Sequence, residues 1–105
     1  MSTPTTIDRQ YVEQTLADAK AKLPQFEAMF PDDRRPREAI VAAEFCLAGK
    51  APSKKEMAAF IGGVTQAASD AMLAKENFAL AEEACWKISL AASLAAKLGS
   101  GATPE

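Results

Sequence analysis

The sequence contains no histidine, which removes the most common general base, proton carrier and metal ligand of proteins. It has only two cysteines, Cys46 and Cys85, far apart and each surrounded by apolar residues, with no C-x-x-C motif. This setting is typical of small buried side chains rather than of a redox pair or a zinc site. We therefore expect no metal site and no cofactor.

Long apolar runs and an excess of basic charge are also missing. No stretch approaches about 18 consecutive apolar residues, so we expect no membrane-spanning segment. The polar residues 1–6 lack the apolar core of a signal peptide, which predicts a cytoplasmic protein. The net charge is −2, and no basic surplus lies on one face, which argues against nucleic acid as a partner.

The acidic residues do not form an obvious catalytic pair. Asp32 and Asp33 lie in a turn beside arginines, and Glu82 and Glu83 are adjacent on a helix and so point in different directions. Glu44 is the one carboxylate within an apolar run; it is either a buried functional group or, more simply, part of an exposed strip. We predict that the protein is not an enzyme and has no catalytic residue.

Alanine supplies 23 of the 105 residues, and β-branched residues are few. Alanine has the highest helix propensity, so the composition favours helices along most of the chain. We predict one all-α domain at residues 6–98, a compact bundle of four to five helices, with disordered tails at residues 1–5 and 99–105. Residues 36–49 and 77–98 are expected to be the most buried segments.

The first helix is expected to begin near Thr5 or Thr6. Pro24 lies inside its apolar stripe and predicts either a kink or a break followed by a second short helix. The stripe keeps its phase across the proline, which favours a kink or a brief break. Its members, spaced by three and four, are Val12, Leu16, Ala19, Leu23, Phe26 and Phe30.

The second helix is expected to begin at Pro36 and to stop at Gly49. It is apolar on two nearly opposite sides, which is typical of a helix packed between neighbours. One side carries Ile40, Ala43 and Leu47, and the other carries Val41, Phe45 and Ala48.

The third helix is expected to begin with a capping box, Ser53 to Glu56. Gly62 and Gly63 lie within it and indicate either a close approach of another helix backbone or a functional kink. Its expected apolar face is Met57, Phe60, Ile61, Val64, Ala68, Ala71 and Met72.

The last helix should begin near Asn77 and end at Leu98. Its main face has small side chains that permit close helix packing: Ala81, Ala84, Cys85, Ile88, Ala91, Ala92, Ala95 and Leu98. A second stripe, Trp86, Leu90 and Leu94, recurs at steps of four. It is either packed in the core or an exposed anchor strip for a partner.

The segment between residues 30 and 43 carries a distinctive string, Phe-Pro-x-Asp-x-Arg-Pro-Arg-x-Ala-Ile-x-Ala-Ala, preceded by Leu-Pro-x-Phe-Glu at residues 23–27. With the alanine-rich helices that follow, residues 10–96 resemble a helical family of immunity proteins from bacterial polymorphic toxin systems. Members of that family commonly carry histidines in the later helices, whereas this chain has none. The resemblance implies a protein that neutralises a cognate toxin by tight binding, without catalysis.

We therefore predict a non-enzymatic protein-binding protein. The expected contact residues are Trp86, Leu90 and Leu94, with the arginines of the charged turn as polar candidates: Arg34, Arg35 and Arg37. The alternative for these arginines is that they are solvated or pair with carboxylates of the same chain. Two alternatives remain open: a homodimer that buries the Trp86 strip between two copies, and a small-ligand binder with an apolar cavity between alanine-faced helices.

Overall fold

Four helices account for most of the residues that the computed structural model describes, which are 9–74 and 78–99. Within these residues there is no strand, so the predicted all-α bundle is confirmed, with four helices. The helices are α1 (Arg9–Met29), α2 (Arg35–Leu47), α3 (Lys54–Ala74) and α4 (Phe78–Gly99).

Some expected boundaries lie outside the described residues. These are the helix starts expected at residues 5–6 and at Asn77, and the tails expected at residues 1–5 and 100–105. Gly99, expected to begin the second tail, is instead the last residue of α4.

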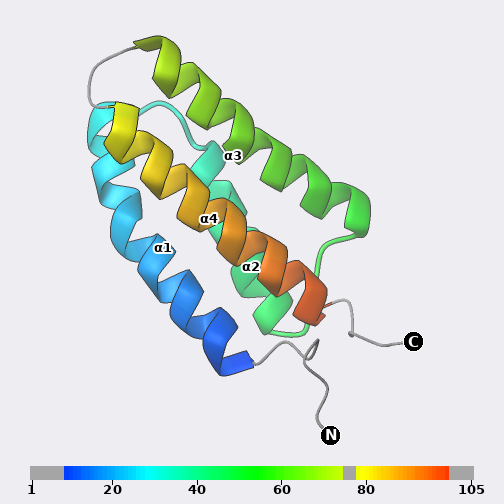
Figure 1. Cartoon of the computed structure of the whole chain (residues 1–105). Helices are drawn as coiled ribbons and strands as arrows, with labels where there is room; N and C mark the ends of the chain where they lie inside the picture. The colour runs from blue at the N-terminus through cyan, green and yellow to red at the C-terminus, as the bar shows by residue number, and fades with distance from the viewer. Residues whose placement is uncertain (1–8, 75–77, 100–105) are drawn as a thin grey trace, which may run out of the picture.

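Consecutive helices run antiparallel, with α4 in front of α2 and flanked by α1 and α3 (Figure 1). Helices α2 and α4 each pack against all three others, whereas α1 and α3 do not contact each other. The two segments expected to be most buried are therefore the two that occupy the middle of the bundle.

Helix α1 continues through Pro24 as a single element, so the alternative of a second short helix beginning there is wrong. Pro24 is exposed, and the Lys20 carbonyl that loses its usual hydrogen-bond donor also lies on an exposed residue, where water can take the donor's place. The predicted stripe faces the core, with Phe30 half-buried at its end.

Helix α2 begins and ends as its sequence predicts, to within a residue. Pro36 lies in its first turn, where no backbone donor is required. At its end Gly49 has φ +82°, the left-handed conformation that glycine adopts without steric cost. The N–H groups of Gly49 and Lys50 donate to the carbonyls of Cys46 and Phe45 at 3.2 and 2.8 Å, the Schellman pattern.

The expectation that α2 is covered on both sides is wrong. Ile40 and Ala43 are buried, but Val41 is 41% exposed, Phe45 is 50% exposed, and Ala48 is exposed too. The three other helices pack against the first side of α2 only, because a bundle of four helices leaves each member an outward face.

The capping box that opens α3 is confirmed. The Ser53 N–H donates to Glu56 Oε1 at 3.0 Å, and the Glu56 N–H donates to Ser53 Oγ at 3.1 Å. The helix then runs unbroken past Gly62 and Gly63. A Cβ on Gly63 would meet the Arg35 side chain at 3.7 Å, so the expected close approach of a helix backbone is wrong.

Two residues of α3 differ from the face that the sequence predicts. Met72 is 52% exposed, whereas Ala67 is buried although the predicted face omitted it. The buried stripe therefore continues from Val64 through Ala67 to Ala71.

The small-residue face of α4 is the centre of the core. Its members are fully or almost fully buried except for Leu98, which packs partly against them: Ala81, Ala84, Cys85, Ile88, Ala91, Ala92, Ala95 and Leu98. Because alanine side chains are short, the neighbouring helices come close to α4, and little volume is left for larger groups.

Lengthening a buried alanine of α4 should therefore be costly. We expect Ala92→Leu to lower the free energy of unfolding by about 1–3 kcal/mol, because the added atoms have no space. The matched control is Ala79→Leu, an exposed site on the same helix, which should change it by less than about 0.5 kcal/mol. Urea denaturation of both variants measures the difference, and equal stabilities would contradict the close packing.

Candidate functional site

Trp86, Leu90 and Leu94 lie on the side of α4 that faces away from the core. Trp86 is 61% exposed, and Leu90 and Leu94 are partly exposed. Lys87 Nζ lies 5.5 Å from the centroid of the indole ring, within the range of a cation–π contact. The sequence left open whether this strip is packed in the core or exposed. Trp86 is exposed, whereas Leu94 is partly buried against the core.

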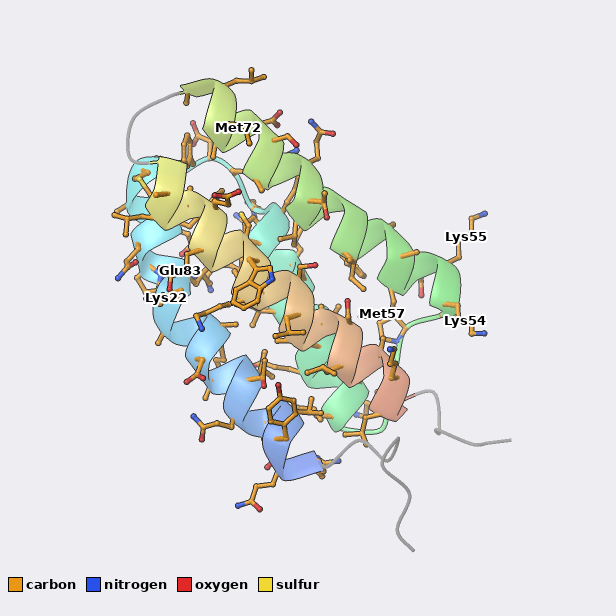
Figure 2. The ribbon with its side chains drawn as sticks, viewed as in Figure 1. Lys22, Lys54, Lys55, Met57, Met72 and Glu83 are labelled. Atoms are coloured by element: carbon orange, nitrogen blue, oxygen red, sulfur yellow. The ribbon has the colours of Figure 1, made fainter. Side chains whose placement is uncertain are left out.

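One ion pair beside this strip joins α4 to α1. Lys22 Nζ lies 3.5 Å from Glu83 Oε2, and the two side chains reach toward each other between the helices (Figure 2). Both groups are partly exposed, so the pair contributes little to stability. It places charge next to an apolar strip, the arrangement found at the rims of protein interfaces.

Arg35 is held by two carboxylates. Its Nε and Nη2 donate to Asp33 Oδ1 and Oδ2 at 2.8 and 2.6 Å, and Nη2 also donates to Asp70 Oδ2 of α3 at 2.8 Å. The Arg35 guanidinium holds the pKa of Asp33 below its usual range, against the opposing effect of burial. Arg35 therefore fastens the turn after α1 to α3.

Arg37 is also paired, through two hydrogen bonds to Glu27 of α1. Its Nε and Nη2 donate to Glu27 Oε2 and Oε1 at 2.8 and 2.7 Å, and this contact lowers the pKa of Glu27. Arg34 is exposed and makes no ion pair within 4 Å in the described part of the chain. Of the three candidate arginines, Arg34 is thus the one not already held by a carboxylate.

The structure does not bring all six predicted contact residues to one surface. Helices α2 and α4 pack through their buried faces, so their outward faces lie on opposite sides of the bundle. The Trp86 strip occupies one side. Arg34 and Arg37 line a groove on the other side, along α2, and Arg35 belongs to neither.

This groove between α2 and α3 was missed by the sequence-based prediction, which placed its apolar members between neighbouring helices. It has a volume of about 530 Å³. The apolar residues on two sides of α2 could have predicted this groove. A bundle of four helices has too few neighbours to cover both sides, so one apolar side is left exposed. The lining residues are Arg34, Arg37, Glu38, Val41, Ala42, Phe45, Lys50, Pro52, Glu56 and Phe60.

Both cysteines are buried free thiols, as expected. Burial raises the pKa of Cys85 to about 11 and also raises the pKa of Cys46. Cys46 Sγ lies 3.8 Å from Met57 Sδ. At neutral pH both groups stay protonated, and a protonated thiol is a poor nucleophile and a poor metal ligand.

Two other hollows bear on small-ligand binding. An apolar hollow of about 370 Å³ lies between the end of α4 and the start of α3, and Ala58 and Ala96 are among its lining residues. A second hollow, of about 670 Å³, lies at the turn after α1, beside Asp32 and Asp33. Within residues 9–74 and 78–99 no group of three or more acidic or thiol side chains is arranged to hold a metal ion.

Comparisons of the chain with family models, with curated proteins and with solved structures found no match. None of the described helices combines the length and the apolar character needed to cross a membrane. Two exposed surfaces are available for contact with other molecules, the outer strip of α4 and the groove along α2.

Replacing Trp86 should hardly affect stability, in contrast to its buried neighbour Ile88. We expect Trp86→Ala to change the free energy of unfolding by less than about 1 kcal/mol, because the exposed side chain has few contacts to lose. Ile88→Ala should lower it by about 2–5 kcal/mol by leaving a cavity. Denaturation of the two variants compares them, and a large loss in Trp86→Ala would mean that the indole is part of the core.

Removing the charge of Asp33 should destabilise the protein in a pH-dependent way. The Asp33 side chain is 16% exposed, and its folded-state pKa is depressed, so its ionised form stabilises the fold above the pKa of the unfolded chain. We expect Asp33→Asn to cost about 1–3 kcal/mol at pH 7. The difference from wild type should shrink as the pH falls below about 4.

Denaturation at a series of pH values measures this effect. The matched control is Asp32→Asn, at an exposed position with no side-chain hydrogen bond within the described residues. A cost for Asp33→Asn that is the same at pH 7 and at low pH would show that the charge of Asp33 has no part in it.

Proposed function

We propose that this protein is a non-enzymatic protein-binding domain that contacts its partner through the outer strip of α4. The observation that carries the proposal is the exposed indole of Trp86, continued along the helix by Leu90 and Leu94. Burial of a large, exposed aromatic side chain by a partner makes the free energy of binding more favourable. Tryptophan is enriched among the residues that dominate interface energetics.

The surroundings of the strip support this role. Trp86 and Leu94 are separated by two helical turns, about 12 Å along the axis. Charged groups lie beside them on the same helix, among them Glu82, Glu83 and Lys87. An apolar centre with a charged margin is the usual layout of a protein contact surface.

The most concrete form of the proposal is toxin neutralisation in the cytoplasm, by occluding a site on the toxin or locking its conformation. It is supported by the resemblance of residues 10–96 to immunity proteins. Three charged residues of the motif that carries this resemblance form contacts within the fold. Arg35 binds Asp33 and Asp70 and so joins the turn to α3, and Arg37 of α2 binds Glu27 of α1. We therefore place the toxin contact on the strip of α4 rather than on Arg35 or Arg37.

A homodimer is the alternative occupant of the same strip, because a two-fold contact would bury one Trp86 against the other copy. Light scattering after size exclusion separates the two readings. A monomer at micromolar concentration excludes a tight homodimer. A wild-type dimer that dissociates in Leu90→Asp would instead show that the strip binds a second copy of the chain.

A charge placed in the middle of the strip should abolish partner binding without unfolding the protein. The experiment is affinity capture from the native host, followed by purification of the captured protein and calorimetric titration against wild type and Leu90→Asp. We expect Leu90→Asp to weaken binding at least about tenfold, because a buried carboxylate at an interface centre has no partner.

Lys55→Glu is the control, since Lys55 points away from the bundle at the start of α3 (Figure 2). It should bind as wild type does, and both variants should keep the helical signal and melting temperature. For toxin neutralisation, co-expression with the captured protein should restore growth with wild type and not with Leu90→Asp. A reconstituted complex with equal affinity for Leu90→Asp would contradict the proposed surface.

A further inference from the structure

We draw no further inference here: the strongest candidate, the apolar groove between α2 and α3 around Val41 and Phe45, carries nothing, because the carboxylates around it balance its cations and nothing in the structure shows what covers it.

Discussion

The close packing of small side chains around α4 shapes the rest of this molecule. Alanines and Cys85 line the buried face of the helix, so α1, α2 and α3 approach it closely. The space between the helices then admits only a few large groups, among which Phe26 and Ile88 are the largest fully buried ones. Trp86 and Phe45 are exposed because they lie on the outward sides of α4 and α2, away from these buried faces.

Electrostatic contacts at the turn after α1 complement this packing. The bond between Arg35 and Asp33 shapes the turn, and the bond between Arg35 and Asp70 ties it to α3. Arg37 does the same for α1 and α2 through Glu27. Residues that stand out in the sequence as a charged motif thus act within the fold, and Arg34 is left to face solvent.

The two exposed surfaces give the molecule two outward faces with different character. The strip on α4 projects one indole from a helix with mixed charges. The groove along α2 is recessed, and both cations and carboxylates line it around its apolar centre. Large apolar side chains are thus exposed on both sides of the bundle, Trp86 on one and Phe45 on the other.

Sequence patterns predict most of the residues that share a helix face, the two ends of α2 and the start of α3, because these depend on contacts within a few residues. The capping box of Ser53, the stop at Gly49 and the buried alanine face of α4 follow from such local rules. Which of these faces are covered depends on the packing of the whole bundle. The apolar pattern of Val41 and Phe45 equals that of a buried stripe, yet no helix packs on it, because coverage depends on how many neighbours a helix has and on where they lie.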